Sequence, residues 1–148
     1  MHDCYPEAAI RHYLDGTLLC QANRYDNAMC HYAFSVECAI KAFVKQFQQI
    51  YPVPYRNPIH DVTENLESLS TYHELLGILN PQLSLLIGVD APPPLLFQDH
   101  PGRRYRNDLN YTATEINTCA EYTAQMTQQI ISAAIDGKLN YQIGSEPL

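Results

Sequence analysis

The stretch that decides the fold is residues 29–50, MCHYAFSVECAIKAFVKQFQQI. Its largest apolar residues recur in steps of three and four, the spacing of one face of an α-helix. Further apolar residues lie outside that face, which is typical of a central bundle helix or a dimer-forming helix with neighbours on several sides. The predicted core face consists of Met29, Tyr32, Val36, Ile40, Phe43, Phe47 and Ile50.

Upstream of this helix, residues 6–22 have the same periodicity. Pro6 and Glu7 suit a first helical turn, because proline there loses no needed hydrogen bond and a carboxylate complements the helix dipole. A polar break at Asn23 and Arg24 separates this segment from the long helix. We therefore predict a first helix from about residue 6 to 22, with Ile10, Tyr13, Leu14 and Leu18 recurring at helical spacing.

Prolines interrupt the helical pattern at several places downstream of residue 50. Prolines at 52, 54 and 58 predict a loop. Asp61 and Glu64 have the form of a capping box, which predicts a short third helix. Apolar residues over 75–87 indicate further helix, interrupted near Asn80 and Pro81. The prolines at 92–94 and 101 then predict an extended connection over residues 89–102, whose length favours a functional or partner-contacting role.

The last helix has a clear start. Thr112 and Glu115 form a capping box, and Tyr111 and Ile116 occupy the staple positions around it. Gly137 is expected to end the helix, and residues 138–148 to fray. Its predicted core face consists of Ile116, Cys119, Tyr122, Met126, Ile130 and Ala133.

These elements predict one all-α domain over residues 1–148, an up-down bundle of four to five helices with its core over about residues 6–136. At 148 residues and 46% hydrophobic composition, the chain is long enough to bury a core unaided. No apolar run approaches the roughly 20 residues that a membrane crossing needs. The start lacks a basic segment followed by an apolar one, so a cytoplasmic protein is expected.

Metal and cofactor sites are not indicated by local spacing. The five cysteines include no Cys-x-x-Cys pair, and they are interpreted as reduced, mostly buried small hydrophobes. The six histidines include no pair at the three-to-five spacing of common metal motifs. The sequence therefore predicts no metal and no cofactor.

The charge distribution restricts where a nucleic acid could bind. A net charge of −7 opposes general binding to phosphate backbones, which draws on lysine and arginine. Arg103, Arg104 and Arg106 nevertheless place three of the nine basic residues within four positions. This arginine cluster is the first candidate contact for a phosphate.

Five short segments follow one another over about residues 6–136: His12-Tyr13-Leu14-Asp15, Arg24-Tyr25-Asp26-Asn27-Ala28, Glu37-Cys38-Ala39-Ile40-Lys41, His60-Asp61 and Arg104-Tyr105. In their residues and their order they resemble the HEPN domains (higher eukaryotes and prokaryotes nucleotide-binding). The resemblance implies a homodimeric helical bundle with a polar cleft. It also implies a role in binding nucleotides or RNA, in ribonuclease activity, or as the partner of a small nucleotidyltransferase.

The chain departs from the family's ribonuclease pattern. Nuclease members place a histidine four to six residues after an arginine, whereas Arg106 is followed at that distance by Tyr111. A phenol with an ordinary pKa of ~10 is a poor general base at neutral pH. The chain is therefore closer to the subgroup without the nuclease motif.

Glu37 and Lys41 are one helical turn apart, so a solvated ion pair is the simplest interpretation. Glu37 also lies only about 80° from the centre of the core face, from which a carboxylate can enter a cleft between helices. Both interpretations stay open, and Lys41 is interpreted as a salt-bridge partner. His60, like His12 and His31, is interpreted as a residue satisfied by local groups.

Two functions remain open. The leading hypothesis is a nucleotide-, RNA- or partner-binding module, either alone or paired with a nucleotidyltransferase in a toxin–antitoxin or defence system, with Glu37, Lys41, Arg104, Tyr105 and Arg106 at its site. The alternative is a metal-independent RNA endonuclease. In it, Arg106 stabilises the transition-state charge and either Tyr111 or His60 handles the proton.

Overall fold

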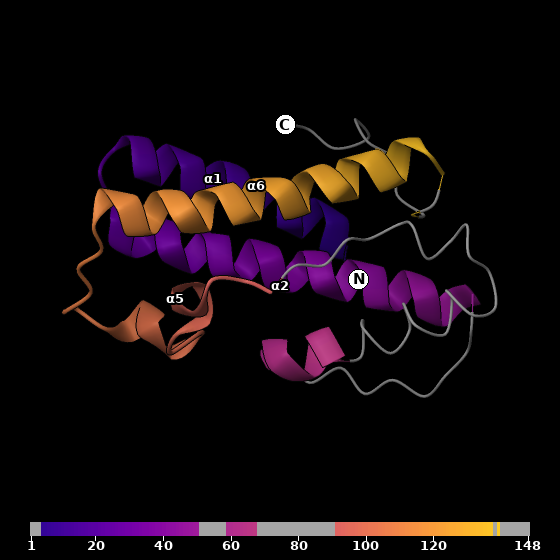
Figure 1. The fold of residues 1–148 in the computed structure, drawn as a ribbon, viewed down its shortest axis with the longest axis horizontal. Helices are drawn as coiled ribbons and strands as arrows, with labels where there is room; N and C mark the ends of the chain where they lie inside the picture. Colours follow the sequence, from indigo (N-terminus) through magenta and orange to yellow (C-terminus); the bar gives the residue numbers. More distant parts are fainter. Residues whose placement is uncertain (1–3, 51–58, 68–90, 138, 140–148) are drawn as a thin grey trace.

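The computed structural model describes residues 4–50, 59–67, 91–137 and 139. Three long helices pack side by side (Figure 1): α1 (Tyr5–Gln21), α2 (Tyr25–Ile50) and α6 (Ala113–Ile135). α1 and α2 run in opposite directions on either side of a tight turn, and α6 lies along both (Figure 1). The described residues contain no strand, and the predicted all-α bundle is confirmed.

α2 is the central element of the bundle. It packs against α1 and α6, and also against two shorter segments, α5 (Pro94–Phe97) and the 3₁₀ turn η1 (Gly102–Tyr105). The prediction of neighbours on several sides is therefore confirmed. The residues of the predicted face whose side chains are described are all buried: Met29, Tyr32, Val36, Ile40, Phe43 and Phe47.

α1 approaches α2 through small residues rather than through its leucines. Ala9 and Gly16 are buried, and a Cβ built on Gly16 would lie 2.8 Å from Cε1 of Tyr32. Such close packing of the backbone against a ring leaves no room for a larger side chain at that position. Leu14 and Leu18 recur at helical spacing but lie away from this contact, and they are 45% and 64% exposed.

The middle of the chain is described only in part. Residues 62–67 form the predicted short helix, and the side chain of Asp61 accepts a hydrogen bond from the amide of Glu64 at 3.0 Å. The predicted loop over residues 51–58 and the predicted helical stretch over 75–87 lie outside the described residues.

The connection into the last helix is more structured than its prolines suggested. Pro94 occupies the first position of α5, where its fixed φ favours a helical turn. η1 follows five residues after α5. The prediction of an extended segment over residues 89–102 is therefore wrong from Pro94 onwards, because proline starts a turn as readily as it prevents one.

α6 begins as predicted. The amide of Glu115 donates to the Thr112 hydroxyl at 3.1 Å, and the amide of Thr112 donates to the Glu115 carboxylate at 2.9 Å. All six residues of the predicted core face are buried. Gly137, with a φ of 72°, follows the C-cap in a left-handed conformation that glycine adopts without strain.

The cysteines of the chain are all free. Cys30 and Cys119 are buried, Cys20 and Cys38 are half-buried, and Cys4 is exposed. The interpretation of the cysteines as mostly buried residues therefore holds for two of the five. Burial raises the pKa of Cys38 to about 12 and that of Cys119 to about 11. Among the described residues, no helix has the combination of length and apolar character needed to cross a membrane.

Candidate functional site

Glu37 lies in the middle of α2 with only 4% of its surface exposed. Its position at the border of the apolar face turns its carboxylate into the bundle rather than towards open solvent. A buried carboxylate is costly unless it is paired and hydrogen-bonded. The interpretation of Glu37 as part of a solvated ion pair is therefore wrong, because its carboxylate is buried between helices.

Three side chains from different parts of the chain converge on this carboxylate. Lys41 Nζ lies 3.2 Å from Oε2 and also donates to the carbonyl of Ile59. His60 Nδ1 lies 3.0 Å from Oε1, and His100 Nε2 lies 2.8 Å from the same oxygen. We call Glu37, Lys41, His60 and His100 the Glu37 cluster.

Electrostatics favour an ionised Glu37. Burial by itself would raise its pKa, but hydrogen bonds from His100 and His60 and the charge of Lys41 outweigh burial and lower the pKa. An ionised carboxylate only accepts hydrogen bonds, so His60 must donate from Nδ1 and His100 from Nε2. With neutral imidazoles, the charges of Glu37 and Lys41 cancel and the cluster has no net charge.

The two histidines differ in their exposure. The His60 side chain is 37% exposed, whereas that of His100 is 2% exposed and its Nδ1 has no hydrogen-bond partner among the described residues. Both rings line a cleft of about 440 Å³ that passes between the start of the 62–67 helix and the segment after α5. The other lining residues are Asp61, Val62, Thr63, Phe97 and Pro101.

Phe34 connects the Glu37 cluster to its aromatic and cationic surroundings. Its ring meets His100 edge-on at a centroid distance of 4.6 Å and His60 at 5.8 Å. The guanidinium of Arg104 lies over the same ring, 5.6 Å from its centroid. The ring of His12 stacks on it at 5.6 Å. Arg104 is thus placed beside the cluster without touching its carboxylate.

No known protein family, curated protein or solved structure matches the chain. The resemblance to HEPN domains therefore stays a prediction, and the site is interpreted from its own geometry.

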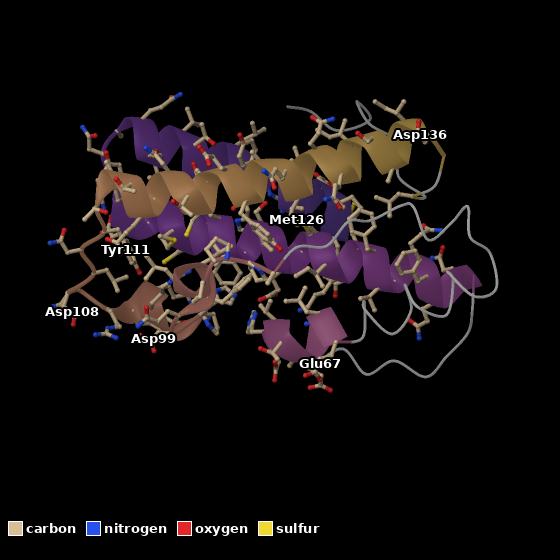
Figure 2. The ribbon with its side chains drawn as sticks, in the orientation of Figure 1. Glu67, Asp99, Asp108, Tyr111, Met126 and Asp136 are labelled. Carbon is tan, nitrogen blue, oxygen red and sulfur yellow. The ribbon has the colours of Figure 1, made fainter. Side chains whose placement is uncertain are left out.

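The three arginines of the predicted cluster have three different environments. Arg103 is 1% exposed and donates to the carbonyls of Leu95, Leu96 and Met29, so it holds the fold together and does not meet a ligand. Its inclusion as a phosphate contact is wrong. Figure 2 labels Asp99 and Asp108, which form ion pairs with Arg106.

Arg106 makes ion pairs with both of these carboxylates, at 3.0 Å to Asp99 and 2.7 Å to Asp108. The hydrogen bond to Asp108 raises the pKa of Arg106. Tyr111, half-buried, packs against the hydrophobic core. Two carboxylates already neutralise Arg106, so the geometry gives no support to a catalytic pair of Arg106 and Tyr111.

Sequence reasoning missed the partners of four histidines. His60, His12 and His31 were interpreted as locally satisfied, and that is wrong, because His60 bonds a carboxylate 23 positions away and His12 pairs with His31 across 19 positions. His100 was not singled out, and no local signal marks it, since its partner lies 63 positions away. The prediction that Lys41 pairs with Glu37 is confirmed.

A second pair of histidines, His12 and His31, lies close to the Glu37 cluster, since the ring of His12 stacks on Phe34. Nδ1 of His12 and Nδ1 of His31 are 3.0 Å apart, which joins α1 to α2. Burial, the neighbouring His31 and the charge of Arg11 together lower the pKa of His12. His12 and His31, unlike His60 and His100, do not contact the Glu37 carboxylate among the described hydrogen bonds.

Proposed function

We propose that the chain binds a phosphate group of a nucleotide or of single-stranded RNA beside the Glu37 cluster, through Arg104 and His60. The observation that carries this proposal is the state of Arg104. Its guanidinium is exposed, and no carboxylate among the described residues forms an ion pair with it. Arginine presents a planar fork of donors that matches phosphate oxygens, and this one is available.

The surroundings of Arg104 suit a nucleotide as well as a phosphate. Arg104 lies over Phe34 and over Tyr105, whose ring is 79% exposed and 4.8 Å from the guanidinium carbon. An exposed aromatic ring next to an arginine is a platform on which a base can stack. The nearby cleft is lined by His60, which gains a positive charge when protonated.

The overall charge of −7 limits the proposal to a local site. Binding that depends on many phosphates requires many cations along one face. A single guanidinium with one or two histidines instead suits one or two phosphates. Short ligands are therefore favoured over duplex DNA or long RNA.

Replacing Arg104 with alanine is expected to weaken nucleotide binding by roughly tenfold or more, because a charge-assisted hydrogen bond contributes about 1.5–3 kcal/mol. The matched control is Arg106→Ala, whose guanidinium is already paired with Asp99 and Asp108 and is expected to change affinity little. The measurement is calorimetric titration with ATP and with a short single-stranded RNA, in EDTA.

Equal losses in the two variants would contradict the proposal, as would the absence of binding heat for the unaltered protein. RNA recovered as shorter fragments after the titration would show that the site also cleaves its ligand.

The homodimer and the nucleotidyltransferase partner that the family resemblance implies remain predictions. The exposed Leu14 and Leu18 on α1 supply apolar surface that suits a protein partner.

A further inference from the structure

Three metal-ligating atoms of the Glu37 cluster point at one another. Oε1 of Glu37 lies 3.0 Å from Nδ1 of His60 and 2.8 Å from Nε2 of His100. A ligand atom from each of the three residues lies within 4.8 Å of the other two. They come from α2, from the turn that precedes the 62–67 helix and from the segment between α5 and η1.

We propose that Glu37, His60 and His100 form a binding site for Zn²⁺ or a similar divalent transition-metal ion. Two imidazoles and one carboxylate are a donor set that zinc accepts, and three protein ligands leave a fourth position open. Bonds of about 2.0–2.2 Å in a tetrahedral site place ligand atoms roughly 3.4 Å apart. The two histidine–carboxylate distances are slightly shorter, so a small outward movement of the side chains admits the ion.

Lys41 supports the site instead of blocking it. Its ammonium group binds Oε2 of Glu37, whereas the closer contact of each histidine is with Oε1; His60 Nδ1 lies 3.0 Å from Oε1 and 3.2 Å from Oε2. The same group is anchored by the carbonyl of Ile59. Hydrogen bonds of this kind to a ligating carboxylate fix its orientation.

The cleft gives a metal ion access to the site from solvent and leaves its fourth coordination position open. His60 and His100 both line it, so an ion entering from solvent reaches their rings without passing through the core. With Zn²⁺ in place, the charges of the ion, Glu37 and Lys41 would sum to about two positive units, which attracts an anion to the fourth position. A phosphate group from the cleft suits that position.

Metal binding requires a change of tautomer in both histidines. In the absence of metal, each donates to Glu37 from the nitrogen that would become the ligand atom. Coordination needs a lone pair on that nitrogen, so the proton moves to Nε2 of His60 and to Nδ1 of His100. With neutral rings, this transfer exchanges protons between ring nitrogens and leaves the number of bound protons unchanged.

This inference rests on the positions of the ligand atoms and does not depend on the phosphate proposal. The sequence prediction of no metal used local spacing, which cannot detect ligands from three separate segments. The two proposals also fail separately, because phosphate binding is tested in EDTA and metal binding with Zn²⁺ alone.

The test is titration of the EDTA-stripped full chain with Zn²⁺ in competition with a chromophoric chelator. We expect one ion per chain, and an affinity loss of about tenfold or more in Glu37→Gln and in His60→Gln. The matched control is His31→Gln, which removes a histidine of the neighbouring pair and is expected to keep the affinity. Circular dichroism checks that each variant retains its helices.

A second measurement on the unaltered protein keeps the proposal testable if a variant does not fold. Co²⁺ in place of Zn²⁺ is expected to give the intense visible absorption of a four-coordinate site. Ring ¹⁵N NMR is expected to show the protons of His60 and His100 moving to the opposite nitrogens. Less than one ion per chain, unchanged ring nitrogens, or an equal loss of affinity in His31→Gln and His60→Gln would overturn the proposal.

Discussion

Replacing Glu37 with alanine is expected to lower the free energy of unfolding by about 3–5 kcal/mol, because it leaves a buried charge without its partner. The Lys41 side chain is 5% exposed, and after the replacement its ammonium keeps the carbonyl of Ile59 and the face of the Tyr5 ring but has no carboxylate partner among the described residues. His60 and His100 lose the acceptor to which both donate. Urea unfolding followed by circular dichroism measures the change.

The matched control for Glu37→Ala is Glu7→Ala on α1. Glu7 and Arg11 have the same four-residue spacing as Glu37 and Lys41, but their side chains are 35% and 61% exposed. Such an exposed pair contributes about 0.3–0.5 kcal/mol. The double replacement Glu37→Ala with Lys41→Met is expected to recover part of the loss, since it removes the unpaired charge. Similar losses in Glu37→Ala and Glu7→Ala would refute this account of the cluster.

Replacing Arg103 with methionine is expected to lower the free energy of unfolding by roughly 3–5 kcal/mol. The change keeps an apolar stem but removes the guanidinium that donates to the carbonyls of Leu95, Leu96 and Met29, of which that of Leu95 keeps the amide of Gln98 as a donor. An unsatisfied buried polar group costs about 1–3 kcal/mol. Arg103→Lys is not expected to restore stability, because an ammonium cannot reproduce the planar fork. Urea unfolding again provides the measurement.

Arg104→Met is the control for Arg103, since it removes a neighbouring arginine that is exposed. Its unfolding free energy is expected to stay close to that of the unaltered protein. If the two methionine variants lose the same stability, Arg103 does not anchor the fold. If Arg103→Lys is as stable as the unaltered protein, charge alone and not the fork of donors holds the carbonyls.

Arg103 also explains how the site is assembled. Its guanidinium joins α5 to the carbonyl of Met29 on α2. The amide of Arg103 donates to the carbonyl of Asp99, and the amide of His100 to that of Phe97. The segment that contains His100 is therefore fastened to α2 within reach of Glu37. A structural arginine thus positions a residue of the candidate site.

The sequence was sufficient for the long helices because their signals are local. The core face of α2 follows from steps of three and four, and the start of α6 from Thr112 and Glu115. The exposure of Leu14 and Leu18 was not predictable in the same way. It depends on how closely Gly16 approaches Tyr32, a contact between two helices.

Within the Glu37 cluster, the pairing that local spacing predicted was that of Glu37 with Lys41, which share a helix. The partners His60 and His100 reach the carboxylate across 23 and 63 positions, and periodicity carries no information at such separations. The arginine cluster shows the same limit. Arg103, Arg104 and Arg106 are near neighbours in sequence, yet one is buried, one is available and one is paired with two carboxylates.

The central claim is that Glu37 holds both histidines by hydrogen bonds, and ring ¹⁵N NMR of the metal-free protein tests it most directly. At a pH where the imidazoles are neutral, we expect His60 to be protonated at Nδ1 and His100 at Nε2. Glu37→Gln is expected to perturb both rings together and to leave His31 unchanged. Rings that each sample both tautomers, or that do not respond to Glu37→Gln, would contradict the account.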